Sequence, residues 1–213
     1  MTVQLLTPAD AFAAALRGSP CCVHGLGHPP TEVPAHRWRL DADAGDQALL
    51  SRCQGATVDI GCGPGRMTYA LMRQGVKAMG IDVVDEAVRQ ARERGAPALL
   101  RDVFGRLPGE GRWETALLAD GNIGIGGDPV RLLRRVHDVI SRDGRVVVDL
   151  AEPGGPVTLH RIGLEVEGRR SRAFPWALVP ADQIELLAEA ASLRVLEVTD
   201  HVGRWFATLE KDA

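Results

Sequence analysis

Short apolar runs alternate with helical periodicity from residue 56 to the end of the chain. Residues 56–60, 76–81, 97–100, 115–119 and 145–150 read as buried strands, and helices are predicted at 64–74, 84–94, 129–141 and 180–191. The last two strands, 194–199 and 205–209, are separated only by residues 200–204. Such a short connection forces an antiparallel hairpin, because a parallel return needs about a dozen residues. The pattern predicts an α/β protein, a three-layer αβα sandwich with a seven-stranded, mostly parallel sheet and a C-terminal antiparallel hairpin.

The chain before residue 56 has a different character. Thr7, Pro8 and Asp10 form the start signal of a first helix, and a second helix is predicted at 41–53. Residues 19–36 are rich in proline and glycine and are predicted to be loop. We therefore divide the chain into a helical cap or lid segment, residues 1–55, and a main domain, residues 56–213.

The strongest local signal is the run VDIGCGPG at residues 58–65, between the first strand and helix of the main domain. Glycines here let the chain turn tightly and let a ligand approach the backbone, while the helix start offers free N–H groups. A dinucleotide fingerprint requires G-x-G-x-x-G, but Arg66 occupies the third glycine position. Asp59, two residues before the first glycine, suits a cationic ligand better than a pyrophosphate.

This D-x-G-x-G-x-G pattern resembles motif I of the class I S-adenosylmethionine-dependent methyltransferases, a Rossmann-like family with small-molecule members in bacteria. The resemblance extends over about residues 56–150 and, more loosely, the final hairpin. It implies S-adenosylmethionine as the cofactor. Gly61, Cys62 and Gly63 would lie against its methionine part, Asp59 would orient its ammonium group, and the carbonyl of Ala119 would reach the same group.

The family also places acids after the next two strands, and Asp82 and Asp102 stand at these positions. The resemblance implies that Asp82 holds the ribose hydroxyls and that Asp102 pairs with the adenine amino group. It also implies that Val83 packs on the adenine face and that Val103 donates a backbone N–H to the ring. The alternative is an ordinary glycine-rich turn beside three acids that coincide by chance.

The acceptor site is less marked, because the cofactor carries the reactive group and no catalytic motif is obligatory. The run DGNIGIGGDP at 120–129 lacks the (N/D)-P-P-(Y/F) signature of enzymes that methylate nucleobase or glutamine nitrogens, which argues against N6-adenine or N4-cytosine methylation. We interpret Asp120 as a catalytic residue facing the methyl group and Asn122 as a substrate-binding residue. The alternative for Asn122 is a turn residue.

The segment HRWR at 36–39 is the part of the cap that we expect over the acceptor. Trp38 would wall the site as a substrate-binding residue, and His36 would serve as a catalytic base. The alternative is that Trp38 packs on the core.

Composition narrows the remaining classes. The net charge of −3 gives no broad basic field, which argues against nucleic-acid binding. No apolar run approaches the roughly 20 residues that span a bilayer, and the start of the chain does not resemble a signal peptide. The cysteines form no disulfide framework, and the Cys and His residues of 21–36 match no zinc spacing, so we expect no metal. We expect a cytoplasmic protein, and its arginine, alanine and glycine content is typical of bacteria.

The sequence thus predicts methyl transfer from S-adenosylmethionine to a small-molecule acceptor, in specialised metabolism. Residues 151–179 are too few for a large recognition domain, which favours a modest acceptor. Two alternatives stay open. An RNA or protein methyltransferase would show a basic patch around Arg169, and a non-catalytic S-adenosylmethionine-binding regulator would lack an acceptor cavity. The sequence indicates no particular oligomeric state.

Overall fold

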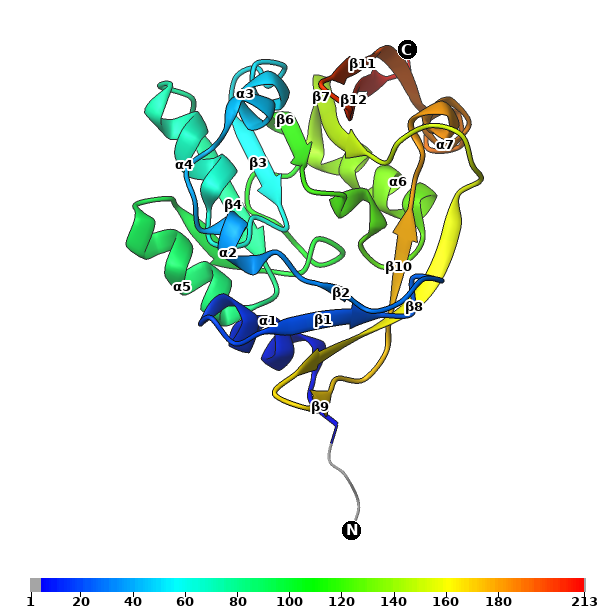
Figure 1. Ribbon diagram of the computed structural model, residues 1–213. Helices are drawn as coiled ribbons and strands as arrows, with labels where there is room; N and C mark the ends of the chain where they lie inside the picture. The colour runs from blue at the N-terminus through cyan, green and yellow to red at the C-terminus, as the bar shows by residue number, and fades with distance from the viewer. Residues whose placement is uncertain (1–4, 213) are drawn as a thin grey trace.

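The main sheet is the centre of the computed structural model, which describes residues 5–212 (Figure 1). Residues 1–4, where the predicted cap segment begins, and residue 213 lie outside the described residues. The strand order is β11-β12-β7-β6-β3-β4-β5. The strands are β3 (Thr57–Ile60), β4 (Ala78–Asp82), β5 (Ala98–Leu100), β6 (Trp113–Leu118), β7 (Ile140–Leu150), β11 (Leu193–His201) and β12 (Arg204–Lys211).

The five strands from β7 to β5 are parallel, and β12 is antiparallel to both β7 and β11. The predicted seven-stranded, mostly parallel sheet with a C-terminal hairpin is therefore confirmed.

Helices cover both faces of this sheet. α3 (Ala44–Leu50) and α4 (Arg66–Arg73) pack on one face against Leu117, Val147 and Phe206. α5 (Asp85–Arg94) lies beside α4, as Figure 1 shows. α6 (Pro129–Val139) and α7 (Ile184–Ala190) pack on the opposite face, against neighbours such as Leu118 and Val148. Successive side chains of a strand point to opposite faces of the sheet, and helices cover each face. Side chains on both faces are therefore buried, and the sandwich has three layers.

A second, antiparallel sheet lies across the carboxyl ends of the parallel strands, in the lower part of Figure 1. It has the order β10-β8-β1-β2, and β9 pairs with β8. Its strands are β1 (Cys21–His24), β2 (Thr31–Glu32), β8 (Thr158–Val166), β9 (Arg169–Arg170) and β10 (Phe174–Leu178). The prediction that residues 19–36 are loop is wrong here, because β1 pairs with β8, more than a hundred residues away in the chain.

This second sheet combines segments from both sides of the predicted boundary at residue 55. β1 and β2 come from the predicted cap, whereas β8, β9 and β10 come from residues assigned to the main domain. The cap is also not purely helical, although α1 (Pro8–Leu16) has the predicted capping box between Thr7 and Asp10. The division into 1–55 and 56–213 stays a prediction, and the strand pairing crosses it.

α1 connects the second sheet to the main domain. Ala11 and Ala15 pack against Leu164 and Val166 of β8, and Leu16 packs against α5. Two further short helical turns, η1 (Asn122–Gly124) and η2 (Ala181–Gln183), follow β6 and precede α7, and α2 (Ala35–Trp38) follows β2. Within residues 5–212, no helix has the length and apolar character needed to cross a bilayer.

Candidate functional site

A cavity of about 550 Å³ lies between the carboxyl ends of the parallel strands and the second sheet. Its volume is in the range of small-molecule sites. Every residue predicted from the motif resemblance to hold the cofactor lines it: Asp59, Gly61, Cys62, Gly63, Asp82, Val83, Asp102, Val103 and Ala119. Among the residues predicted for the acceptor side, Trp38, Asp120 and Asn122 line the cavity as well, whereas His36 does not.

The glycine loop is built for close approach of a ligand to the backbone. Gly61 and Gly63 have φ of 73° and 53°, in the left-handed region that favours glycine. A Cβ at position 63 would meet no atom within 4 Å, so this glycine leaves open space at the cavity wall. A Cβ on Gly65 would press on Ala91 at 2.8 Å, so the third glycine lets the start of α4 pack on α5.

Asp59 is a buried carboxyl group at the floor of the cavity. The Thr68 hydroxyl, on α4, donates a hydrogen bond to it at 2.6 Å. Burial raises the pKa of Asp59 from 3.8 to about 7, and the Thr68 hydrogen bond opposes this rise. No cation compensates Asp59 among the described side chains that bond to it, so the ammonium group of a ligand would fit beside it.

Asp82, at the end of β4, organises the glycine loop. One carboxylate oxygen accepts the Gly63 N–H at 2.9 Å, and the other accepts the Val84 N–H at 2.8 Å. Burial raises its pKa, and the backbone hydrogen bonds work in the opposite direction. Each oxygen keeps a lone pair for a further donor, so the predicted ribose contact is compatible with this geometry.

The end of the cavity that is predicted to hold the nucleoside is more open. Val83 is 60% exposed although it is apolar, which suits a surface that a flat ligand covers. Asp102 is exposed and accepts the Phe104 N–H at 2.9 Å, whereas Val103 is buried. These three residues lie after β4 and β5, so parallel strands bring them to one edge, as the sequence predicts.

Asn122 ties the segment after β6 to the glycine loop. Its amide nitrogen donates to the carbonyls of Ile60 at 2.9 Å and Gly61 at 3.0 Å. Both amide N–H groups are thereby used inside the protein, so only the amide oxygen is available to a ligand. The alternative turn role accounts for these contacts, and a substrate-binding role of Asn122 stays a prediction limited to that oxygen.

Asp120 is held at the cavity edge in the left-handed region, with φ of 52°. Arg66 donates to one of its carboxylate oxygens at 2.7 Å, and Arg204 lies 3.4 Å from the other. Its backbone N–H donates to Asp149 at 3.1 Å. This backbone conformation is uncommon for a residue with a side chain and persists only where the surroundings stabilise it. The contacts with Arg66, Arg204 and Asp149 provide that stabilisation.

The two arginines belong to an ion-pair network that sequence reasoning did not find. Arg204, on β12, bonds to Asp149 at 2.6 Å and to the fully buried Asp46 at 2.7 Å. Arg66, the first residue of α4, also pairs with Asp46. Together with Asp120, these residues come from five separate parts of the chain, so no local motif marks them.

α2 brings Trp38 to the cavity and turns His36 away from it. In this single helical turn, Ala35 and Trp38 face the protein, three residues apart, and His36 is exposed. An exposed imidazole outside the cavity wall cannot reach an acceptor there. The prediction of His36 as a catalytic base is therefore not supported by its position.

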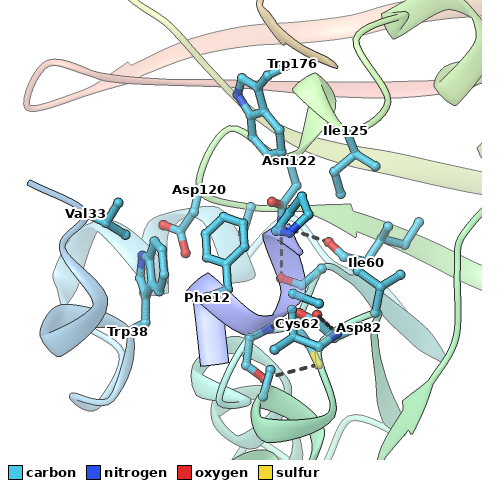
Figure 2. Close-up of a pocket in the computed structure, with 18 of the residues that line it drawn as sticks. Phe12, Val33, Trp38, Ile60, Cys62, Asp82, Asp120, Asn122, Ile125 and Trp176 are labelled. Atoms are coloured by element: carbon cyan, nitrogen blue, oxygen red, sulfur yellow. Dashed lines mark hydrogen bonds between the residues drawn. The ribbon is translucent and has the colours of Figure 1, made fainter. Parts of the chain in front are cut away.

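Three aromatic residues that were not predicted also line the cavity: Phe12 of α1 and Phe174 and Trp176 of β10. In Figure 2, Cys62 and Asp82 lie in the lower part of the cavity, Phe12 and Trp176 lie above them, and Trp38 lies at the left. The sequence of β10 could have indicated an aromatic face, because Phe174 and Trp176 are two residues apart and lie on the same side of the strand. Their position beside the aromatic side chains of α1 and α2 depends on the second sheet, which brings these segments together.

Residues 57–144 match the model of a family described as a methyltransferase domain. No curated protein sequence matches the chain. The structure is similar to an S-adenosylmethionine-dependent methyltransferase from Bacteroides fragilis in complex with S-adenosyl-L-homocysteine. The TM-score is 0.81, with 17% identity over 96% of this chain and 94% of that chain.

Two similar structures are methyltransferases with defined acceptors. One is the 1,6-didemethyltoxoflavin-N1-methyltransferase of Burkholderia thailandensis, with a TM-score of 0.60 and 19% identity over 80% of this chain and 79% of that chain. The other is a sugar N-methyltransferase from a Streptoalloteichus species, with a TM-score of 0.59 and 16% identity over 83% and 88%.

The chain contains a methyltransferase domain and has the Rossmann-like fold of the S-adenosylmethionine-dependent methyltransferases. The class predicted from motif I is thus confirmed. The expectation of S-adenosylmethionine as the cofactor agrees with the domain match and with the bound ligands of the similar structures.

Proposed function

We propose that this protein transfers the methyl group of S-adenosylmethionine to a small-molecule acceptor bound beneath the second sheet. The observation that carries the proposal is one cavity with two different ends. The glycine loop, Asp59, Asp82 and Asp102 form a polar end, and the aromatic side chains of α1, α2 and β10 form an apolar end.

The polar end fits the cofactor. Asp59 would orient the ammonium group, the loop from Gly61 to Gly63 would lie against the methionine part, and Asp82 would bind the ribose. Two features support this assignment: a buried carboxyl group with no cationic partner among residues 5–212, and a glycine whose side-chain position is open.

The apolar end supports a small acceptor. The second sheet covers this end, so a folded RNA or protein would have to enter a cavity of about 550 Å³. Among the exposed arginines around Arg169, Arg170 pairs with Glu165 at 2.9 Å, which reduces the basic character of this surface. These observations favour a small molecule over the RNA or protein alternative.

The acceptor cavity also argues against the regulator alternative, which needs only the cofactor end. Two similar structures are N-methyltransferases of a toxoflavin precursor and of a sugar, which supports a role in specialised metabolism. The cysteines at 21, 22, 53 and 62 are all free, which agrees with a reducing compartment such as the cytoplasm.

The bound cofactor supplies an electrophilic methyl group on a sulfonium. The chain contributes binding and orientation: the carboxyl ends of the strands hold the cofactor, and the second sheet places the acceptor and excludes water. Asp120, at the junction of the two ends, is the polar side chain that we propose closest to the transferred group.

Isothermal calorimetry with S-adenosylmethionine, S-adenosylhomocysteine and NAD tests the cofactor assignment. We expect both sulfur ligands to bind and NAD not to bind, because Arg66 replaces the third dinucleotide glycine. Tighter binding of NAD would overturn the proposal. Binding of both sulfur ligands without methyl transfer to any acceptor would instead point to the regulator alternative.

A further inference from the structure

The apolar end of the cavity is walled by aromatic rings in mutual contact. Phe12 lies 6.4 Å from Trp38 and 6.1 Å from Phe174, and Phe174 lies 6.5 Å from Trp176, measured between ring centroids. All four rings are only partly buried and line the cavity, so part of each ring is free to contact a ligand. Tilted and edge-on rings of this kind favour contact with another flat ring.

The charges around this wall argue against an anionic acceptor. Within residues 5–212, no histidine, lysine or tyrosine lines the cavity. Arg66 lines it, but its guanidinium is paired with Asp46 and Asp120. Arg101 lies beside Asp102, at the nucleoside end. A phosphate or carboxylate on the acceptor would therefore find no free cation at the aromatic end among the described residues.

Five acidic residues of the described chain line the cavity, and none is a favourable general base for a hydroxyl acceptor. Glu32 and Asp102 are exposed, and a hydrated carboxylate is a weak base toward a hydroxyl. Asp120 contacts a guanidinium with each of its oxygens. Asp59 is bonded to Thr68, and Asp82 bonds to two backbone N–H groups at the cofactor end. A hydroxyl acceptor needs a base to remove its proton as it attacks, whereas a neutral nitrogen attacks with its own lone pair.

We infer that the acceptor is a planar, uncharged aromatic ring system that is methylated on a ring or amino nitrogen. The inference rests on the proposed function, because it names the substrate class of the same cavity. The nitrogen lone pair forms a bond to the methyl carbon while the carbon–sulfur bond breaks and its electron pair stays on sulfur. The nitrogen gains the positive charge, and where it carried a hydrogen, that proton leaves to water afterwards.

Three two-ring probes of similar size separate the features of this inference. Isoquinoline has an aromatic ring nitrogen and is mostly uncharged at neutral pH, and 2-naphthol has a hydroxyl. Decahydroisoquinoline has a nitrogen in saturated rings that is protonated at neutral pH, so it lacks both the planarity and the uncharged nitrogen of the inferred acceptor. Binding to the protein loaded with S-adenosylhomocysteine is measured by calorimetry. Products formed with S-adenosylmethionine are identified by mass spectrometry.

We expect isoquinoline to bind more tightly than decahydroisoquinoline and to gain one methyl group, while 2-naphthol binds without being methylated. Methylation of 2-naphthol at a similar rate, preference for the saturated amine, or no methylation of isoquinoline would each overturn the inference. Failure to bind S-adenosylhomocysteine would instead contradict the proposed function, so the two failures are distinguishable.

A pair of variants tests the aromatic wall itself. Phe174→Leu removes a ring from the cavity, whereas Phe104→Leu removes a partly buried ring that does not line it. We expect Phe174→Leu to raise the Kd for isoquinoline by about two- to tenfold, with the S-adenosylhomocysteine Kd unchanged. Phe104→Leu should leave the Kd for isoquinoline unchanged. Equal effects of the two variants, or none from Phe174→Leu, would contradict the assignment of the wall.

Discussion

Asp82 has two tasks at the residue scale, because it holds the glycine loop and faces the proposed ribose position. Asp82→Asn keeps one carbonyl oxygen for the Val84 N–H but removes the charge. Hydrogen bonds to a charged group contribute about 1.5–3 kcal/mol each. We therefore expect the Kd for S-adenosylhomocysteine to rise by about 10- to 100-fold, measured by calorimetry. The thermal midpoint should also fall, because the Gly63 N–H loses its acceptor.

The control for Asp82 is Asp85→Asn, which neutralises an exposed carboxylate three residues away, outside the cavity wall. It removes the same charge from the protein as a whole. Equal loss of affinity in both variants would mean that a general electrostatic effect, and not a ribose contact, explains the result.

The raised pKa of Asp59 predicts that the free energy of unfolding depends on pH. This pKa is about 7 in the folded protein, against an ordinary value of 3.8. Between about pH 4 and 7, the folded state keeps a proton that the unfolded state has released, so the unfolding free energy due to this group falls as pH rises. Asp59→Asn should lack this fall. Urea unfolding from pH 5 to 8 should show the wild-type stability declining relative to the variant.

Thr68 provides the matched test of the same group. Its hydroxyl stabilises the ionised carboxylate, so Thr68→Val should raise the Asp59 pKa further and extend the decline above pH 7. Parallel curves for the wild type and Asp59→Asn would show that Asp59 titrates at its ordinary pKa in the folded state.

The predicted cofactor residues that line the cavity share one property: their positions follow from local order along the chain. Asp59, Asp82 and Asp102 each follow or end a strand, and parallel strands carry such positions to one edge. The sequence did not place His36 correctly, because the direction of its side chain depends on which side of a four-residue helix packs inward. The use of both Asn122 N–H groups likewise depends on how close the segment after β6 lies to the glycine loop.

At the element scale, the ion-pair network joins α3, α4, β7, β12 and the segment after β6 that carries Asp120. Arg204→Met keeps much of the side-chain volume but leaves Asp149 and the buried Asp46 with less compensation. Breaking a buried pair costs about 3–5 kcal/mol. Because Arg204 is 26% exposed, we expect a smaller loss of about 2–3 kcal/mol in the free energy of unfolding, measured with urea.

Arg194→Met is the control in the same hairpin. Arg194 pairs with Glu210, but its side chain is 56% exposed, so its loss should cost less than about 1 kcal/mol. An equally small effect for Arg204→Met would show that the network adds little to stability.

The second sheet shows why part of the fold was missed. Residues 21–24 (CCVH) form too short a run to predict a strand, and the prolines and glycines that follow are typical of loop. The strand exists because β8 pairs with it, with Val23 opposite Leu164. Pairing over such a distance leaves no periodic trace in β1. The strands β3 and β5 are no longer than β1, but they can be recognised because they alternate with segments of helical periodicity.

At the scale of the whole molecule, the cover of the cavity is one sheet made from two distant segments. A lid formed by the N-terminal segment alone would have to break the β1–β8 pairing to open. β1 and β8 share four paired positions, from Cys21 opposite Val166 to His24 opposite Gly163. We therefore expect the two segments to move together, if the cover moves during the entry and release of ligands.

A cross-strand disulfide tests this expectation. Cys22 lies opposite Glu165, and Cα atoms of directly opposed antiparallel residues are about 4.5–5.5 Å apart, which a disulfide can bridge. Glu165→Cys, in a Cys21→Ala background, would link β1 to β8 on oxidation. If the cover moves as a unit, the oxidised protein should exchange S-adenosylhomocysteine at the rate of its reduced form, measured by stopped-flow tryptophan fluorescence. Glu165→Ser in the same background controls for losing the ion pairs of Glu165 with His24 and Arg170. Ligand exchange that is blocked on oxidation and restored by a reducing agent would show instead that the N-terminal segment opens by itself, as a separate lid.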